Sequence, residues 1–320
     1  MTNITAPRFT DEAAAREHLE AIRWPDGPVC PHCGSFAATR LPAVRGKPSK
    51  RNPEGKLRHG IIQCNDCRQQ YSVTVGTVFE DSKVPLNKWL LCNHLLVSSK
   101  KGISAHQIHR MLGVTYKTAW FMCHRIREAM TTDATPMGGE GVAIEADETY
   151  FGKDKTAAPS RTPIRNMNKI VSLIDRNTGV ARSFVVTERL NAETVAHILY
   201  TNVDRASTLY TDEAQHYVRP GREFAAHYSV NHQAKEYVRH GAPEITTNTI
   251  EGFFGIFKRG MRGVYQHCGQ QHLQRYVAEF DFRYSHRAAC GYDDESRANV
   301  ALLGIEGKRL TYRRTCGAQA

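Results

Sequence analysis

The chain has 320 residues, and its 43 Lys and Arg side chains outnumber its 32 Asp and Glu side chains, which gives a formal net charge of +11. This excess of positive charge favours a polyanionic partner such as nucleic acid. No apolar stretch reaches the roughly 18 residues of a membrane span, and the polar amino-terminal residues lack the apolar core of a signal peptide. We therefore expect a cytoplasmic protein.

Two Cys-x-x-Cys pairs mark the first region, CPHC at 30–33 and CNDC at 64–67. Each two-residue spacer lets two thiolates bind one ion, and two such pairs can close a tetrahedral site around Zn²⁺. A thioredoxin-like redox centre is the alternative, but it would need only one pair. We predict a structural zinc ribbon with four ligands: Cys30, Cys33, Cys64 and Cys67.

The number and spacing of the cysteines also indicate the redox compartment of the protein. The chain has nine cysteines, and an odd number with this paired spacing fits metal binding in a reducing cytosol better than a disulfide framework. Between the pairs, residues 34–63 carry seven Lys or Arg and one acid, Glu54. This basic insertion is either a solvated loop or a flap that contacts phosphate.

Residues 103–130 contain two apolar stripes at helical spacing, separated by Gly113. Thr115 is placed to cap the second helix. A helix, a tight turn and a second helix form the helix-turn-helix pattern of DNA-binding proteins, although an ordinary helical hairpin has the same pattern. In the DNA-binding interpretation the recognition helix begins with three residues: Tyr116, Lys117 and Thr118.

The third region alternates apolar strand-like runs with amphipathic helices, which is typical of an α/β domain. The predicted strands are 141–152, 168–176, 180–188, 207–212 and 223–232. The predicted helices are 191–203, the segment from 247 to 263, and 273–287.

Acidic residues stand at unusual places in two of these strands. Strand side chains alternate between faces, so Glu145 and Asp147 lie opposite the apolar Ile144 and Ala146. A carboxylate inside a hydrophobic strand is costly unless it meets a cation or a metal ion. Asp212 ends a later short strand, where it either caps the following turn or binds a metal.

The segment TNTIEGFFGIFKRGMRG at 247–263 contains one carboxylate, Glu251. With Asn248 as the cap, Glu251 fits a capping box, in which it would bond only to a backbone amide. This interpretation leaves Lys258 and Arg262 unexplained, although both fall on the same edge of the helix as Glu251. That edge borders the predicted core face, which is a stripe of five residues: Ile250, Phe253, Phe254, Phe257 and Met261.

Four segments together resemble a known family: ADETYFG, YTDEAQHY, TNTIEGFFGIFKRG and LQRYVAEFDFRYSHR. Two strand aspartates, a helix glutamate and a lysine seven residues later resemble the signature of DDE transposases on a ribonuclease H-like fold. The chain is most similar to the prokaryotic insertion-sequence transposases with an amino-terminal zinc ribbon, family fifteen-ninety-five in insertion-sequence nomenclature. GTVFEDSKVPLNKW at 76–89 also matches that pattern.

The resemblance implies an α/β fold, a ribonuclease H-like mixed sheet with flanking helices, preceded by a zinc ribbon and a helical helix-turn-helix domain. The expected domains are a zinc ribbon with its basic insertion (1–82), a helix-turn-helix (83–130), a linker (131–141), a catalytic domain (142–290) and a basic tail (291–320).

The resemblance also implies the site residues. Asp147, Asp212 and Glu251 would bind two Mg²⁺ ions, or Mn²⁺ in their place, and Lys258 would stand beside them in the catalytic site. DNA contacts are expected from Arg262 and Asn248, in addition to the recognition helix. We expect supporting or structural roles for three other acids: Glu145, Glu148 and Glu213.

The function implied is a transposase that binds insertion-sequence ends and catalyses metal-dependent DNA cleavage and strand transfer. Its partners would be double-stranded DNA, as terminal inverted repeats and target, and a second copy of the chain, since two ends must be paired. It would associate with the nucleoid when bound. The alternatives are a DNA-binding regulator derived from a transposase, and a ribonuclease H-like nuclease without strand transfer.

Overall fold

The computed structural model describes residues 4–48, 50, 53–55, 57–131, 135–155, 162–231, 238–239 and 241–311. Parts of the expected basic insertion (49, 51–52 and 56), of the linker (132–134) and of the tail (312–320), and the end of the fifth predicted strand (232), lie outside the described residues. The chain divides into two compact units. Unit 1 comprises Met1–Ser98, Ala105–Met130 and Asp294–Ala320, and unit 2 comprises Ser99–Ser104 and Thr131–Asp293.

Unit 1 begins with small antiparallel sheets around the cysteine pairs. One sheet has the strand order β1-β4-β5, and a separate pair is formed by β2 and β3. The bounds are β1 (Ala38–Arg40), β2 (Val44–Arg45), β3 (Leu57–Arg58), β4 (Ile62–Cys64) and β5 (Gln70–Tyr71).

The helices of unit 1 form a bundle. They are α1 (Pro7–Thr10), α2 (Glu12–Arg23), α3 (Leu86–Ser98), α4 (Ala105–Leu112), α5 (Tyr116–Ala129) and α10 (Asp294–Leu303). Helix α10 packs on α2, α3 and α5, and the buried amide of Asn93 donates a 2.9 Å hydrogen bond to the Ala298 carbonyl. The sequence predicts a basic tail here rather than a helix, because a short helix of mixed polarity gives little periodic signal on its own.

The turn between α4 and α5 has the chemistry that the sequence predicts. Gly113 has a φ of +60°, a left-handed conformation that favours glycine. The hydroxyl of Thr115 then accepts a 3.2 Å hydrogen bond from the amide of Thr118 and so caps α5. Ala119 and Ile126 of α5 are buried, whereas Met111 of α4 is 54% exposed.

Unit 2 is built on a five-stranded mixed sheet with the order β10-β9-β6-β7-β8. The central strand β6 pairs in parallel with β9 and antiparallel with β7, while β10 is parallel to β9 and β8 is antiparallel to β7. The bounds are β6 (Ala143–Lys153), β7 (Met167–Asp175), β8 (Ala181–Val186), β9 (Thr208–Thr211) and β10 (Ala226–Ser229).

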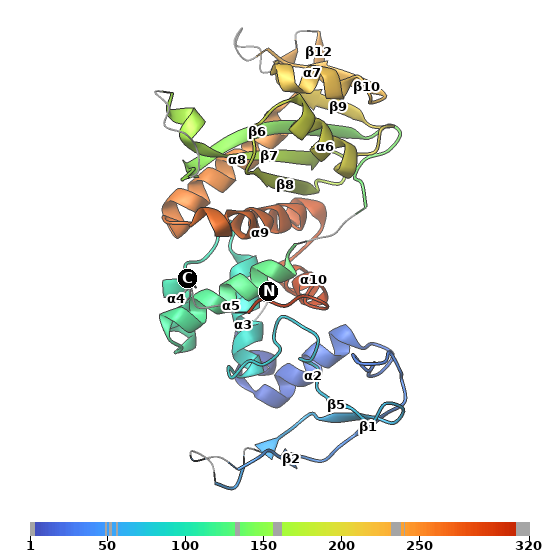
Figure 1. The fold of residues 1–320 in the computed structure, drawn as a ribbon, viewed down its shortest axis with the longest axis vertical. Coiled ribbons are helices and arrows are strands. Elements are labelled where there is room, and N and C mark those ends of the chain that lie inside the picture. Colours follow the sequence, from blue (N-terminus) through green and yellow to red (C-terminus); the bar gives the residue numbers. More distant parts are fainter. Residues whose placement is uncertain are drawn as a thin grey trace, which may run out of the picture. The chain divides into compact units, whose positions relative to one another are not determined.

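Helices cover both faces of this sheet. On one face α6 (Ala192–Asn202) and α7 (Gln215–Gly221) pack on Ile144 and Ala146. On the other, α8 (Asn248–Gly260) and α9 (Leu273–Ser285) pack on Ile170 and Ile174. Figure 1 shows α6 and α8 on opposite sides of the strands. This confirms the expected α/β class, a ribonuclease H-like mixed sheet with flanking helices.

Helices α8 and α9, which cover the second face, pack on the sheet through their apolar stripes. The five residues predicted for the core face of α8 are all buried, and α9 adds Leu273, Tyr276, Val277 and Phe280. Gly260 lets the helices meet, because a Cβ atom there would lie 2.5 Å from the ring of Phe280.

Shorter elements complete unit 2. The strands β11 (Val238–Arg239) and β12 (Ala242–Thr246) pair antiparallel just before α8. Single turns lie at Pro163–Asn166, Met261–Tyr265, Gln270–His272 and Ala288–Cys290. Over the part of the chain that the structure describes, no helix combines the length and the apolar character needed to cross a membrane.

Candidate functional site

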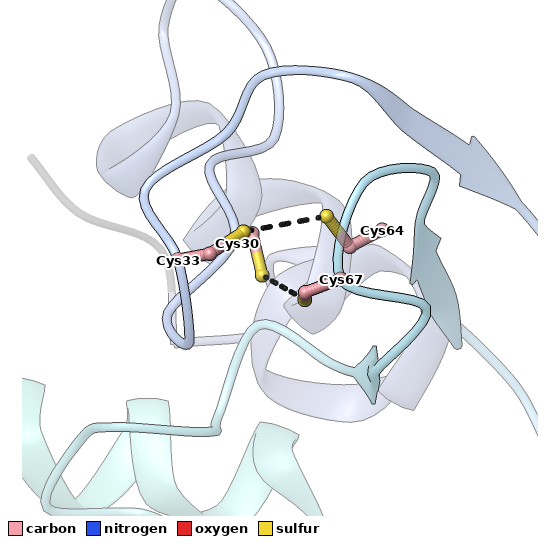
Figure 2. A group of neighbouring side chains, drawn as sticks. All are labelled: Cys30, Cys33, Cys64 and Cys67. Carbon is pink, nitrogen blue, oxygen red and sulfur yellow. Dashed lines mark hydrogen bonds between the residues drawn. The ribbon is translucent and has the colours of Figure 1, made fainter.

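The four predicted zinc ligands converge at one point of unit 1. The first pair lies on a turn ahead of β1, and the second pair runs from Cys64, the last residue of β4, to Cys67 in the turn before β5 (Figure 2). The Sγ atoms of Cys30 and Cys67 are 3.6 Å apart, as are those of Cys33 and Cys64. All four sulfurs lie within 4.8 Å of one another.

This sulfur cluster fits a zinc ion. Four thiolates at about 2.3 Å around a tetrahedral Zn²⁺ would be separated from one another by about 3.8 Å, close to the spacing found here. Backbone amides of Cys67 and Asp66 lower the pKa of the Cys64 thiol to about 7, whereas at Cys33 the lowering by the Ser35 amide is outweighed by the neighbouring sulfurs, which raise the pKa of that thiol to about 12. A bound cation would offset this mutual opposition and hold all four sulfurs as thiolates. The four cysteines therefore form a structural zinc site.

The start of α5 presents the side chains predicted for DNA contact. Tyr116 is 44% exposed, and its ring stacks on His106 with 4.2 Å between centroids. Lys117 is exposed. Thr118 is partly held by the cap, since its hydroxyl lies 2.9 Å from that of Thr115.

In unit 2 the two predicted aspartates come together where β9 ends beside the central strand β6. Strand β9 pairs with β6 only as far as Tyr210 opposite Glu145. Beyond that point β9 pairs only with β10, as far as Thr211, and the carboxylate of Asp212 approaches that of Asp147. Oxygen atoms of Asp147, Glu148 and Asp212 all lie within 4.8 Å of one another.

Backbone amides orient the two aspartates. Oδ1 of Asp147 accepts a 2.7 Å hydrogen bond from the amide of Glu148, and Oδ1 of Asp212 accepts a 3.0 Å bond from the amide of Ala214. Asp212 thus stabilises the turn after β9, as one of its two sequence interpretations required. The same carboxylate also faces Asp147, so the two interpretations are compatible.

Glu148 is the member of the cluster to which the sequence analysis gave only a supporting role. Its Oε2 accepts hydrogen bonds from Nε2 of His216 at 3.1 Å and from the hydroxyl of Tyr217 at 3.0 Å. Side chains alternate along β6, so Glu148 points to the opposite face of the sheet from Asp147. Helix α7 begins shortly after Asp212, and its His216 and Tyr217 hold the carboxylate of Glu148 near the two aspartates.

The acids of the cluster oppose one another's ionisation. Burial, with the charges of Glu148 and Asp212, raises the pKa of Asp147 to about 8. Burial and the charge of Glu148 also raise the pKa of Asp212. A divalent cation would offset this repulsion, and hard carboxylate oxygens are the ligands that Mg²⁺ prefers. The donor set therefore fits a magnesium-type site.

Glu251 lies near this cluster but outside its tightest group. Its charge reaches Asp147 and adds to the rise in the pKa of that carboxyl. Lys258, two turns further along α8, is half-buried. Burial and the charge of Arg262 lower the pKa of Lys258, and the charge of Asp147 opposes that change. One acid and one amine of α8 thus lie within electrostatic range of Asp147.

The start of α8 differs from the predicted capping box. Thr247, rather than Asn248, is the N-cap residue, and its side chain makes no capping hydrogen bond. Asn248 is the exposed first residue of the helix. Instead, the Ile250 amide donates a 2.8 Å hydrogen bond to Oε2 of Glu145, which lies on β6. Sequence reasoning missed this bond because it joins residues 105 positions apart.

Arg176 is a second residue that sequence reasoning missed. It follows β7, and its Nε donates a 2.6 Å hydrogen bond to Oε1 of the fully buried Glu145. The pairing of β6 with β7 brings the two residues together, because Ile144 stands opposite Asp175. A buried glutamate on a hydrophobic strand was the signal that a cationic partner had to exist.

Comparisons with known proteins agree with this division of sites. The family profile described as "ISXO2-like transposase domain" matches residues 138–285, which include Asp147, Asp212 and Glu251. The profile described as "Transposase zinc-ribbon domain" matches residues 10–70, which include all four zinc-site cysteines.

A relative from Halobacterium salinarum, named "Uncharacterized protein in transposable element ISH50", is 25% identical over 301 residues, or 86% of this chain and 91% of the relative. A chain in the cryoEM structure of a simian T-cell lymphotropic virus intasome with PP2A regulatory subunit B56 gamma is 14% identical, with a TM-score of 0.29. That similarity covers 56% of this chain and 64% of the viral-complex chain.

Both family profiles match in the expected order, and each contains the side-chain cluster that the structure assembles in its unit. The chain therefore belongs to the insertion-sequence transposases that combine a transposase zinc ribbon with an ISXO2-like DDE transposase domain.

Proposed function

We propose that this transposase binds the ends of its insertion sequence, cuts the DNA there and joins the cut end to target DNA. The observation that carries the proposal is the approach of Asp147 and Asp212, from two adjacent strands, to within 4.8 Å at one edge of the sheet. Glu251 on α8 is the proposed third acid, since its charge acts on Asp147.

Cutting a phosphodiester requires in-line attack on a phosphate that repels nucleophiles. Two Mg²⁺ ions, when bound, activate the attacking water or 3′-hydroxyl and stabilise the leaving oxygen. The three acids would hold the metal. Glu148, fixed by His216 and Tyr217, would shape the same site.

Lys258 and Arg262 are proposed to hold the DNA backbone beside the acids. Lys258 is half-buried and within range of the charge of Asp147, while Arg262 is exposed one turn further along. Cationic side chains at this place would contact phosphate oxygens and orient the strand without reading its sequence. Asn248 is exposed at the start of α8 and could add a contact.

Recognition of the element ends is assigned to unit 1. The exposed Tyr116 and Lys117 at the start of α5, with Thr118, would enter the major groove, and the zinc ribbon with its basic insertion would contact phosphates. The proposed domains are the zinc ribbon, the helix-turn-helix and the catalytic domain expected from the sequence, with α10 of the expected tail packed among the helices of unit 1. We also propose at least a dimer on DNA, located in the cytoplasm and on the nucleoid when bound.

The test uses DNA that flanks this gene, labelled at both ends, with purified protein and Mg²⁺ or Mn²⁺. One substrate is intact and the other is pre-cut to expose a 3′-hydroxyl. Wild type is compared with Asp212→Asn, and DNA binding is measured separately by gel shift. The proposal predicts a defined nick that leaves a 3′-hydroxyl, joining of the pre-cut end, and loss of both reactions in the variant with binding retained.

Each alternative gives a different result. Cutting without joining would contradict strand transfer and support a ribonuclease H-like nuclease. Specific binding of the ends without cutting or joining by wild type would contradict the catalytic proposal and support a regulator derived from a transposase.

A further inference from the structure

The buried carboxylate of Glu145 joins the central strand to the helix that carries Glu251. Glu145 is 0% exposed. Its Oε1 accepts a 2.6 Å hydrogen bond from Nε of Arg176, and its Oε2 accepts a 2.8 Å hydrogen bond from the amide of Ile250. A buried charge is tolerated only with such partners, and here each oxygen has one.

Arg176 extends this connection to the chain that enters α8. One terminal nitrogen donates a 2.6 Å hydrogen bond to the carbonyl of Glu244, and the other donates to the carbonyl of Thr246. The guanidinium carbon also lies 4.2 Å from the centroid of the Tyr210 ring on β9. One side chain therefore contacts β6, β9 and β12, and its planar fork is suited to several acceptors at once.

These contacts add to a local acceptor at the helix start, the hydroxyl of Thr246, which accepts a 3.1 Å hydrogen bond from the amide of Asn248. The first amides of a helix have no partner within the helix, and Thr247 at the N-cap position makes no side-chain capping bond. Glu145 accepts from one of these amides, that of Ile250, and places a negative charge at the positive end of the helix. The strand thus supplies the acceptor for the Ile250 amide, in addition to the local acceptor for the Asn248 amide.

The position of Glu145 relates this cap to the acids of the site. Glu145 and Asp147 are two residues apart on β6, on the same face of the sheet. Ile250 directly precedes Glu251 in α8. The bond between Glu145 and Ile250 therefore fixes where Glu251 stands relative to Asp147.

We propose that Glu145 and Arg176 are positioning residues, which hold the first turn of α8 so that Glu251 faces Asp147. This inference rests on the proposed function, since it assigns Glu251 to the metal site. Both oxygens of Glu145 are engaged by protein donors, so its role is to hold the helix rather than to bind the metal.

The test compares Glu145→Gln and Arg176→Lys with wild type. Glu193→Gln, an exposed change in the first turn of α6, is the matched control. Hydrogen–deuterium exchange of the 247–257 backbone is measured without metal or DNA. The Mn²⁺ concentration that gives half-maximal nicking is measured on the flanking DNA, and gel shift monitors DNA binding.

Loss of a charged hydrogen bond to the Ile250 amide should speed exchange at the start of α8 by about tenfold, with β7 and β8 unchanged. The Mn²⁺ requirement of both variants should rise by about 10–100-fold, as for other residues that orient metal ligands. The control should match wild type in both measurements.

Wild-type exchange and wild-type Mn²⁺ dependence in both variants would overturn the inference. An equal rise of exchange in β7 and β8 would also overturn it, because the role would then be general stability. If wild type does not nick the DNA, the proposed function fails instead, and the exchange experiment still decides whether Glu145 and Arg176 hold α8.

Discussion

Tyr217 donates a 3.0 Å hydrogen bond to Oε2 of Glu148. Tyr217 lies on α7, the helix after Asp212, and Glu148 directly follows Asp147 on β6, so α7 holds Glu148 near both aspartates. We predict different effects for the two candidate third acids. Glu251→Gln should lower nicking more than 100-fold, because a metal ligand is lost, whereas Glu148→Gln should lower it about 10–100-fold by disturbing the ligands. The measurement is single-turnover nicking of the flanking DNA.

The Tyr217→Phe variant separates the roles further. It removes one bond to Glu148 and leaves His216 in place, so nicking should fall only a few-fold. Normal nicking by Glu251→Gln, together with complete loss in Glu148→Gln, would make Glu148 the third ligand and Glu251 a structural residue.

Lys258 gives a second prediction. Lys258→Gln should reduce kcat/KM for nicking by about tenfold, because a half-buried cation beside the acids no longer contacts the DNA phosphate. Lys258→Arg should recover part of the activity, since it keeps the charge. The control is Arg259→Gln, an exposed neighbour on the same helix. Equal rates for Lys258→Gln and wild type would exclude a role in catalysis.

The zinc site predicts a defined metal content. The protein as purified should contain one Zn²⁺ per chain by mass spectrometry of the metal, and Cys67→Ser should lose it. Loss of zinc should weaken binding to the element ends, because the zinc ribbon would unfold. Cys290→Ser, in unit 2, should keep its zinc. Full zinc occupancy in the Cys67→Ser variant would contradict the four-cysteine site.

Asp281 on α9 predicts a dependence of stability on pH. Burial raises the pKa of this carboxyl to about 7, although the hydroxyl and amide of Ser183 donate hydrogen bonds to it. In the unfolded chain the carboxyl ionises near pH 3.9, about the model-peptide value. Between these values the folded state binds more protons, so the contribution of Asp281 to the free energy of unfolding falls as pH rises.

The corresponding variant is Asp281→Asn, which does not titrate. The free energy of unfolding, measured with urea, should fall less from pH 5 to pH 8 in this variant than in wild type. Titratable groups that both proteins share contribute equally, so the difference between the two proteins reports the contribution of Asp281. The same loss in both proteins would mean that Asp281 keeps an ordinary pKa.

The sequence predicts those features that depend on neighbouring residues. The spacing of Cys30, Cys33, Cys64 and Cys67 predicts the sulfur cluster, since each pair is local. The cap by Thr115 needs only the next three residues. Alternation along β6 places Ile144 and Ala146 in the core, and the periodicity of α8 places its apolar stripe there.

Features that depend on distant pairing were not predictable in the same way. The capping-box pattern at Asn248 and Glu251 is local, but the structure uses Glu145 for the helix start. That bond requires the packing of α8 on β6, and the partner Arg176 requires the register of β6 against β7. Likewise, Glu148 joins the acids only because α7 turns back over β6 after β9 ends.

The central claim is that Asp147, within β6, and Asp212, directly after β9, bind a divalent metal ion for DNA cleavage. The most direct measurement is calorimetric titration of Mn²⁺ into the protein bound to a pre-cut DNA end. Wild type is compared with Asp147→Asn and Asp212→Asn, and Glu193→Gln is the control. We predict Mn²⁺ binding by wild type and control and its loss in both aspartate variants, with DNA binding retained. Equal Mn²⁺ binding by all four proteins would contradict the proposed metal site.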